Sequence, residues 1–558
     1  MQDRDILKIP LESEQDFSKF LQRMRGEADV CLEQLAEGLM SASQLARIEK
    51  GQRPITKNMR DRLLGRLGVA DDLYENLLNI EDYAVWEAQR DILEAVEGQE
   101  TCRAQELIKN YKKQALADDK IRKQFCLVME AELLKQRGAA SCEIADCYAR
   151  AVKLTVPDSE NLCLDRKLLS IQEINMVLEY AFYHRKSDFA KQCMELMKFV
   201  ENTAYDNLSK VKIYPKIACY YLQEIFSGKE ERSVGQMRKA LRVCNQAVEM
   251  LRDTGRAFYL LELLEMKVKI LEHLERETRH GNAESADCQE CRELVKLMRY
   301  LYDACSVPAY MQECTYLYRQ RWVFYVGDVL RIRRKMAGLT QKQLCDGICS
   351  VRTLRRSEKK EANMQRACLE KMLRKLGLSK EYQRARLVTN DREVLRLRRE
   401  ILVCRNNQDT SRCRKLLGQI REKISLDIPE NRQYLTELQA SLDWMEGKIS
   451  KEEFAAREEQ ALNCTLNTDN IFGANEMYLT EMEILCIRKK IQGLEGDEKK
   501  KLIGGLMRFF ETYEKACALS SCISMYEFVM GYLASEVGSI GDCQISTEVN
   551  KKILKKSL

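Results

Sequence analysis

Proline, histidine and long apolar runs are scarce in this chain of 558 residues. The six prolines leave long stretches uninterrupted, and Leu, Glu, Lys, Arg, Ala, Gln and Met dominate those stretches, which is the composition of helices. The longest apolar runs, such as the one around Phe258 to Leu264, are broken by Glu or Lys well before the ~20 residues that cross a bilayer. The sequence therefore predicts an all-α protein without a membrane-spanning segment.

A secretory signal and a disulfide framework are missing as well. Charged residues such as Asp3, Arg4 and Lys8 alternate with single apolar residues near the N-terminus, so the apolar core of a signal peptide is absent. The 23 cysteines are scattered singly, as small core hydrophobes are in a reducing compartment. We therefore expect a cytoplasmic protein with free thiols.

Motifs for catalysis and for cofactors are also lacking. The chain has no Gly-rich phosphate loop after a strand, no Gly-x-Ser-x-Gly and no His-Glu-x-x-His, and its histidines occur only at positions 184, 273 and 280. Cys288 and Cys291 follow His273 and His280 with the spacing of half a zinc site, but no second cysteine pair lies at a matching distance. We expect no enzyme activity, no cofactor and no metal.

An internal repeat is the main positive feature of the sequence. Sliding the chain by 309 residues aligns two segments of about fifty residues without a gap, and the match continues downstream, where Glu173-Ile174 meets Glu483-Ile484 after one inserted residue. The aligned identities in the first copy are Gln34, Leu35, Gly38, Ser41, Leu45, Arg47, Glu49, Lys50, Leu64, Leu67 and Gly68. The chain thus contains a small module and the helices behind it, twice.

The segments behind each module have apolar residues at i, i+3, i+4 and i+7, which is typical of amphipathic helices in stacked antiparallel pairs. In "CEIADCYARAVKL" the spacing of small and aromatic residues loosely resembles a tetratricopeptide repeat. The predicted organisation is an N-terminal segment (1–16), helix-turn-helix domain 1 (17–70), helical repeat array 1 (71–325), helix-turn-helix domain 2 (326–378), and a shorter helical repeat array 2 with a basic tail (379–558).

The first module has the pattern of two short helices joined by a tight turn. Leu35, Ala36 and Leu39 form one apolar face, Gly38 permits the exit, and Ser41 with Gln44 has the spacing of a capping box. In the helix that follows, the 3.6-residue period turns two residues, Leu45 and Ile48, to the core and turns Ser43, Ala46, Arg47 and Lys50 outward. Gly51 and Pro54 then end this helix and begin the next one, since proline is tolerated in a first helical turn.

These residues resemble a known family. "LAEGLMSASQLARIEKGQRPITKNMRDRLLGRLGV" looks like the Xre/Cro-repressor helix-turn-helix, and "LTQKQLCDGICSVRTLRRSEKKEANMQRACLEKMLRKLGL" is similar. The resemblance implies double-stranded DNA as a partner, with the helices that begin near Ser41 and Ser350 in the major groove. The implied DNA-binding residues are Ser41, Ser43, Gln44, Arg47, Lys50, Arg53, Thr340, Gln341, Ser350, Arg352, Thr353, Arg355, Arg356 and Lys359.

Each copy departs from the family pattern. The first has Cys31-Leu32 where Thr-Gln is expected, which removes a DNA contact there. The second has Ser357 in place of the core residue Ile48 and Lys360 in place of Gly51, which puts its packing and the exit of its recognition helix in question. One copy is therefore expected to bind DNA more weakly than the other.

Positive charge is concentrated in the second copy, although the net charge of the chain is only +6. Such a cluster neutralises phosphates, and Arg352 and Arg355 replace smaller outward residues of the first copy at positions suited to reading guanine. A solvated basic face is the alternative interpretation. The cluster consists of Arg331, Arg333, Arg334, Lys335, Arg352, Arg355, Arg356, Lys359 and Lys360.

A repressor-like module joined to tetratricopeptide-like repeats resembles the RRNPP (Rgg/PlcR-like) transcription regulators of quorum sensing. The resemblance implies a short signalling peptide or a protein partner in the repeats, and either a pseudo-dimer by duplication or a homodimer. The peptide site is unassigned, although Asn175, Arg185, Tyr220 and Tyr221 lie in helices that can line a groove. Two alternatives remain: a protein-interaction scaffold whose modules no longer bind DNA, and a DNA-associated component of a mobile element.

Overall fold

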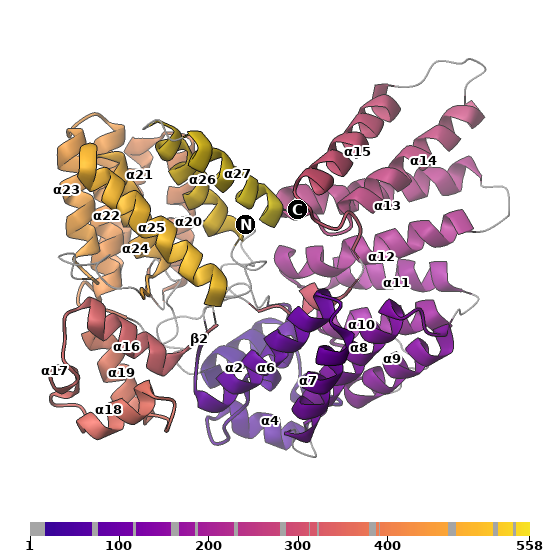
Figure 1. Cartoon of the computed structure of the whole chain (residues 1–558), viewed down its shortest axis with the longest axis horizontal. Coiled ribbons are helices and arrows are strands. Elements are labelled where there is room, and N and C mark those ends of the chain that lie inside the picture. Colours follow the sequence, from indigo (N-terminus) through magenta and orange to yellow (C-terminus); the bar gives the residue numbers. More distant parts are fainter. Residues whose placement is uncertain are drawn as a thin grey trace. The chain divides into compact units, whose positions relative to one another are not determined.

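The computed structural model shows an almost entirely helical chain (Figure 1), as the sequence predicts. It describes residues 17–69, 76–114, 119–157, 164, 167–184, 188–227, 233–278, 286–311, 313–320, 323–378, 387–389, 391–466, 476–516, 523–539 and 543–557. Within these ranges no helix is long and apolar enough to cross a membrane. The predicted N-terminal segment (1–16) and Arg185 lie outside the described residues.

Two groups of four short helices share the same design. The first group comprises α2 (Phe17–Glu27), α3 (Leu32–Ala36), α4 (Ala42–Glu49) and α5 (Lys57–Arg66). The second group comprises α16 (Val326–Met336), α17 (Gln341–Cys345), α18 (Val351–Glu358) and α19 (Arg366–Lys375). Each helix of the second group begins and ends 309 residues after its counterpart in the first.

Longer helices follow each group and pack side by side with their neighbours in the sequence. The first array consists of α6 (Ile80–Glu97), α7 (Thr101–Lys113), α8 (Lys120–Gln136), α9 (Ser141–Thr155), α10 (Ile171–His184), α11 (Phe189–Asn202), α12 (Asn207–Ser227), α13 (Val234–Thr254), α14 (Leu260–Thr278) and α15 (Ala286–Ala304). A single 3-10 turn, η5 (Thr315–Leu317), follows α15.

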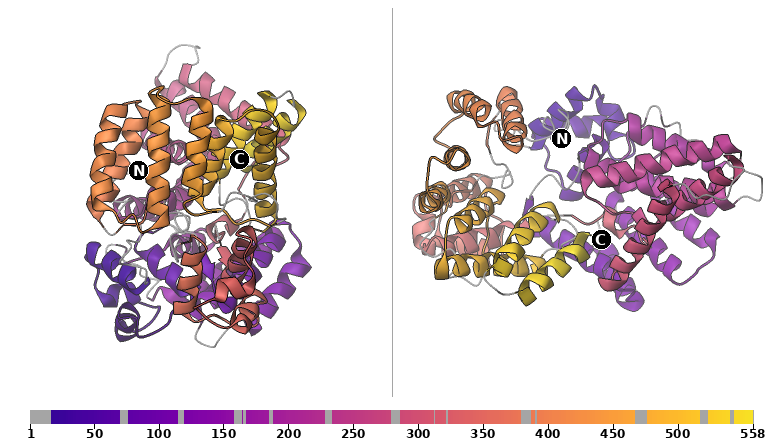
Figure 2. Two further views of the ribbon diagram at one scale, coloured as in Figure 1. Left: turned by 90° about the vertical axis from the view of Figure 1, so that its left-hand side faces the viewer. Right: turned by 90° about the horizontal axis from the view of Figure 1, so that it is seen from above.

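The second array is shorter than the first, and Figure 2 shows several of its helices side by side. It consists of α20 (Arg392–Asn406), α21 (Thr410–Lys423), α22 (Pro429–Met445), α23 (Lys451–Leu462), α24 (Glu481–Gln492), α25 (Gly496–Ala516), α26 (Ile523–Ser539) and α27 (Cys543–Ser557), the last of which carries the basic tail. Among the described elements, α14 and α15 have no counterpart here.

The repeat extends to unusual backbone conformations. Left-handed φ angles recur 309 residues apart, most simply at Gly38 and Gly347, which both have φ +71°. Lys360 adopts φ +58° where its counterpart Gly51 has φ +69°. Helix α18 therefore ends with the same backbone conformation as α4, although lysine replaces glycine there. The replacement of Gly51 by Lys360 does not change how the helix ends.

Two short strands form a parallel pair, in which β1 (Asn76–Leu78) lies beside β2 (Val323–Tyr325). The chain divides into two compact units, one containing residues 21–71 and 87–319 and the other containing 72–86 and 320–550. The strand pair belongs to the second of these units, where Leu78, Trp86 and Val323 form a small buried cluster. The start of α6 is thus held beside the second group, as the hydrogen bond from Ile80 N to Asn363 Oδ1 (3.0 Å) also shows.

Candidate nucleic-acid interface

Helix α4 has the cap and the buried face that the sequence predicts. Ser41 Oγ accepts a hydrogen bond from Gln44 N (3.2 Å), and Ser41 N donates to Gln44 Oε1 (3.1 Å), so both halves of the capping box are present. Leu45 and Ile48 are buried, as are Leu35, Ala36 and Leu39 in the preceding segment. The beginning of α4 is therefore well fixed.

The outward side of α4 carries most of the residues that the family resemblance implies. Ser41, Ser43, Arg47 and Lys50 are exposed, and Arg53 is exposed in the loop that follows. Gln44 is only half-buried, but its side-chain oxygen is already engaged in the cap. Pro54 does not start the next helix, because α5 begins only at Lys57 after an N-cap at Thr56.

An arginine braces the end of α4 and another braces the end of α18, a role that sequence reasoning missed. Arg25 on α2 binds Glu49 at the end of α4 through two hydrogen bonds (2.7 and 2.9 Å) and also donates to Val30 O (2.8 Å). In the second group, Arg334 binds Glu358 in the same way (2.8 and 3.2 Å). A bidentate arginine–carboxylate pair fixes relative orientation as well as adding attraction. A signal was available, since the glutamates and the arginines both recur 309 residues apart.

Helix α18 presents a more strongly charged surface. Ser350 caps it by accepting a hydrogen bond from Thr353 N (3.2 Å), and Leu354 is fully buried. The basic side chains Arg352, Arg355, Arg356 and Lys359 are all exposed, and within the described part of the chain none of them forms an ion pair. Its only acidic residue, Glu358, is buried and bound by Arg334.

Two further residues implied by the resemblance lie at the start of α17. Thr340 Oγ1 accepts a hydrogen bond from Gln343 N (3.2 Å), and Thr340 N donates to Gln343 Oε1 (2.8 Å). Gln341 donates from Nε2 to Glu358 Oε2 (2.6 Å), so this amide supports the brace instead of lying free on the surface. Cys31 caps α3 through the same two bonds, which means that the departure from Thr in the first copy keeps the cap.

Part of the basic cluster predicted in the second copy is internal. Arg331 binds Asp328 and Glu476, Arg334 binds Glu358, and Arg333 is only 1% exposed. Sequence reasoning placed Arg331, Arg333 and Arg334 on a predicted DNA-binding surface because it did not identify their acidic partners, most of which are distant in the chain. Lys360 lies over the rings of Tyr83 and Tyr325, 4.5 and 5.3 Å from their centroids.

Buried ion pairs anchor each group on its own array. In the first unit, Arg66 of α5 binds Glu173 of α10 (2.6 and 3.1 Å) and donates to Thr155 O (3.0 Å) and Glu37 O (2.7 Å). Burial alone raises the pKa of Glu173, but the neighbouring guanidinium groups of Arg66 and Arg62 outweigh it and hold this pKa well below its usual range.

The second unit has equivalent residues around its buried glutamate, but the arginine that binds this glutamate comes from a different helix. Glu483, Thr465 and Gln433 occupy the places of Glu173, Thr155 and Gln124, with Thr465 Oγ1 donating to Glu483 Oε1 (2.8 Å) and Gln433 Nε2 donating to Thr465 Oγ1 (2.9 Å). The guanidinium that binds Glu483 (2.9 and 3.0 Å) comes from Arg333 of α16, not from α19. Each group is therefore attached to its array through a different helix.

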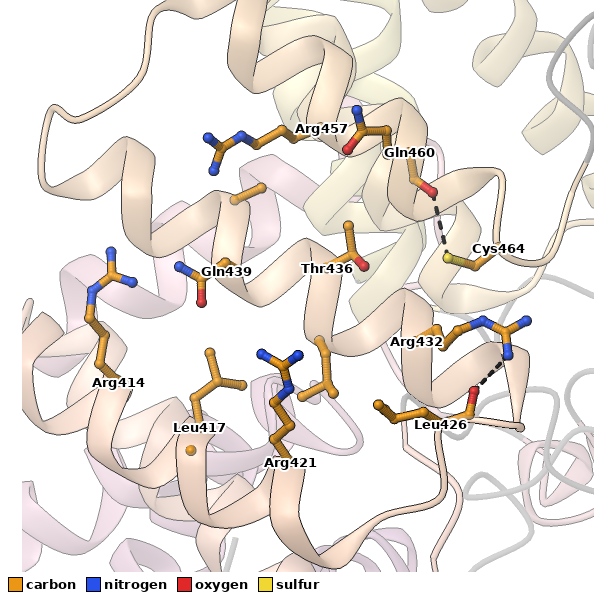
Figure 3. Close-up of a pocket in the computed structure, with 13 residues that line it drawn as sticks. Arg414, Leu417, Arg421, Leu426, Arg432, Thr436, Gln439, Arg457, Gln460 and Cys464 are labelled. Carbon is orange, nitrogen blue, oxygen red and sulfur yellow. Dashed lines mark hydrogen bonds between the residues drawn. The ribbon is translucent and has the colours of Figure 1, made fainter.

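The second array also contains a pocket of about 540 Å³ between α21, α22 and α23 (Figure 3). Its lining is rich in arginine and amide groups, and Arg421 and Gln439 extend into the space between their helices. Arg414 is neutralised by Asp443 and Glu446. The pocket therefore offers donors to a polar or anionic group of a ligand.

The first-array candidates for a groove, Asn175, Tyr220 and Tyr221, are all engaged in packing or hydrogen bonds. Asn175 is fully buried and accepts from Lys216 Nζ (2.6 Å), and Tyr220 donates to Glu179 (3.0 Å).

The cysteines of the described residues are all free, as predicted. In the part of the chain that the structure describes, no group of three or more His, Cys, Asp and Glu residues is placed to hold a metal ion. No family model matches the chain, and a comparison with curated proteins finds no match.

Proposed function

We propose that the protein is a sequence-specific DNA-binding transcription regulator with two helix-turn-helix modules, α2–α5 and α16–α19, each followed by tetratricopeptide-like helix pairs. The observation that carries the proposal is the exposed face of α18. Four cations project from one short helix, and that helix is capped at its start and braced at its end. Such a helix fits the major groove, where arginine binds phosphates and reads guanine.

The charge on α18 differs from an ordinary solvated face. On α20, for comparison, exposed Arg396 is paired with Glu393 and Glu400 on the same helix. Mixed charges of this kind are typical of helices that only face water. On α18 the single acid is buried in the brace, so the exposed face is purely positive and is available to a polyanion.

The two modules are expected to contribute unequally. Helix α4 offers Arg47 and Lys50, whereas α18 offers four cations. In addition, the turn before α4 packs on the first array, because Lys120 Nζ donates to Gly38 O (2.6 Å) and Lys167 binds Glu37. This packing favours a partly structural role for the first module, and to that extent it supports the scaffold alternative.

The presence of two modules in one chain supports a pseudo-dimer that reads two half-sites as a monomer in the cytoplasm. A homodimer is the alternative, and the mass of the DNA-bound species separates the two. A peptide or protein ligand of the repeats completes the proposal. The pocket supports it through Arg421 and Arg432, which form no ion pair among the described residues, whereas Arg414 and Arg457 are paired with Asp443.

The test is a selection of bound duplexes from a random library, followed by affinity measurements at several salt concentrations. The variant R352A/R355A/R356A is compared with R238A/K239A/R242A, which removes three exposed cations from α13 in the first array. Each lost phosphate contact lowers the slope of log K against log salt by about 0.9. We expect a slope smaller by up to about 2.7 for the α18 variant and an unchanged slope for the control. A selection without enrichment even at low salt supports the scaffold instead.

A further inference from the structure

The connector that follows α15 packs along the first array. Among its described residues, the turn η5 is the only helical part. We call its described residues 310, 311 and 313–319 the strap. Cys314 and Leu317 in the strap are fully buried, although neither belongs to a helix of the array. A long loop with buried residues needs partners for its polar groups.

The first half of the strap is held by α14 and α8. Met311 N donates to Glu262 Oε1 (2.8 Å), and Tyr310 Oη donates to Glu265 Oε1 (2.9 Å). Next, Gln136 Nε2 donates to the side chain of Glu313 (3.1 Å). The strap thus begins over the last helices of the array and moves toward the first ones.

The second half of the strap continues across α12, α10, α8 and α6. Tyr316 Oη donates to Lys212 O (2.9 Å), and its ring stacks on Phe258 with 4.7 Å between centroids. Gln172 Nε2 donates to Leu317 O (2.9 Å), and Tyr318 packs edge-on against Phe125 (5.5 Å). Arg319 ends the strap in an ion pair with Glu97.

These partners come from α6, α8, α10, α12 and α14, which are alternate helices of the array. One face of the array therefore binds a single segment through hydrogen bonds to its backbone at Met311 N and Leu317 O and through contacts with the rings of Tyr316 and Tyr318. In peptide-binding sites of other kinds, main-chain hydrogen bonds likewise give affinity and side-chain contacts give specificity. Here the bound segment belongs to the same chain.

A buried charge network lies beneath the middle of the strap. Glu132 accepts from Cys314 Sγ (3.2 Å) and from Tyr148 Oη (2.6 Å), and it shares Lys135 with Glu179. Burial raises the pKa of Glu179, but Lys135 and Lys216 outweigh burial and lower it to about 2. The strap seals this network from water, so its position controls the solvation of several buried charges.

The fit between the strap and the array is incomplete. Glu132 Oε2, Gln136 Oε1 and the Tyr318 hydroxyl are buried and accept or donate no hydrogen bond among the described residues. A buried polar atom that has lost its water and has no partner is destabilising. An occupant that satisfied these atoms would be bound more tightly than the strap is.

We propose that this face of the first array is a peptide-binding site, occupied in this structure by the strap as an internal ligand. The preferred external peptide carries two tyrosines at alternate positions and a cationic end, because the partners are the rings of Phe258 and Phe125 and the acid Glu97. The predicted peptide ligand of the repeats would bind to this face of the first array, so the inference rests on the proposed function. By displacing the strap, the peptide would act on the segment that leads into β2 and α16.

The inference concerns the array and not DNA, so its test uses the full chain without a duplex. The probe is a synthetic peptide with the sequence of residues 309–320, in which serine replaces Cys314. Alkylation of each cysteine of the protein is followed by mass spectrometry. Cys219 and Cys244 serve as internal controls, since they are as fully buried as Cys314 and burial raises the pKa of all three thiols.

We expect the peptide to speed the alkylation of Cys314 by about tenfold or more, while Cys219 and Cys244 keep their slow rates, because only the strap opens locally. A peptide with alanine at the positions of Tyr316 and Tyr318 should have no effect. Without added peptide, the substitution R319Q in the protein should speed the alkylation of Cys314 and leave the rates of Cys219 and Cys244 unchanged. Equal rates for the three cysteines, or a rate for Cys314 that the peptide does not change, would show that the strap is a fixed part of the array.

Discussion

The turn before α4 and the equivalent turn before α18 offer a matched pair of substitutions, Gly38→Ala and Gly347→Ala. Both glycines have φ +71°, and they occupy equivalent positions in the first and second groups. A Cβ at Gly347 meets nothing within 4 Å, whereas a Cβ at Gly38 overlaps the carbonyl oxygen of Thr155 and the ring of Pro157. The two substitutions therefore share the cost of the backbone conformation and differ only in the contact with the array.

The shared cost is about 1–2 kcal/mol, which is the penalty of a Cβ in the left-handed region. The additional cost at Gly38 follows from the bonds that a shift of the turn would break. These are the bond from Lys120 to Gly38 O and the bond from Arg66 to Glu37 O (2.6 and 2.7 Å), both of which are part-buried. Hydrogen bonds to charged groups contribute about 1.5–3 kcal/mol each. With both bonds lost, we expect Gly38→Ala to cost about 4–8 kcal/mol in total.

Hydrogen exchange of the amides in α3–α4 and in α17–α18 measures the two costs in one protein. The wild type and the two single variants are compared at one pH and temperature. We expect Gly347→Ala to speed exchange modestly in α17–α18, and Gly38→Ala to speed exchange in α3–α4 and in the end of α9 that it contacts. Equal costs at the two positions, within about 0.5 kcal/mol, would refute the inferred docking of the first group on its array.

Three further substitutions test the ionic interactions. Glu173→Gln leaves Arg66 buried without a countercharge and should lower the free energy of unfolding by about 3–5 kcal/mol at neutral pH. The pKa of Glu173 is lower in the folded state, so the wild type is more stable than the variant above the usual pKa of 4.5. This difference in stability should shrink as the pH is lowered below 4.5. Glu458→Gln should stabilise the second unit in urea unfolding, increasingly from pH 5 to pH 8, because burial raises the pKa of Glu458 and folding at high pH must bury the charge or protonate it. Arg334→Lys keeps the charge but loses the two-point bond to Glu358, so duplex titrations should show weaker DNA binding with an unchanged salt slope.

The parts of the fold that the sequence predicts are those set by local spacing. The capping box at Ser41 and the buried positions Leu45 and Ile48 follow from interactions within one or two turns of helix, so the 3.6-residue period is enough to find them. Because the two copies align at a constant offset of 309 residues, the bounds of each short helix in one group also predict the bounds of its counterpart in the other. The all-α prediction needs no more than composition.

The internal role of Arg333 was beyond such reasoning. Its partner, Glu483, lies 150 residues away in the chain, and the helix α16 carries basic residues on more than one side. Local charge patterning therefore counted Arg333 with the DNA-binding surface. The strap was missed for the same reason, because a segment such as 310–319 shows no periodicity of its own and its partners are spread over five helices.

The exchange of the anchoring arginine changes how each group of short helices meets its own array. The acceptor residues Glu173 and Glu483 are equivalent, but Arg66 comes from α5 and Arg333 comes from α16. The counterpart of Arg66 is Lys375, which is exposed and donates to Gln343 O, and the counterpart of Arg333 is Met24, which is buried. Each module thus meets the same surface of its array with a different face, so α4 and α18 are presented differently relative to their own arrays. For a regulator of the proposed kind, selected duplexes should therefore contain two unequal half-sites instead of a symmetric palindrome, and a perfect palindrome would indicate two copies of the second module from separate chains.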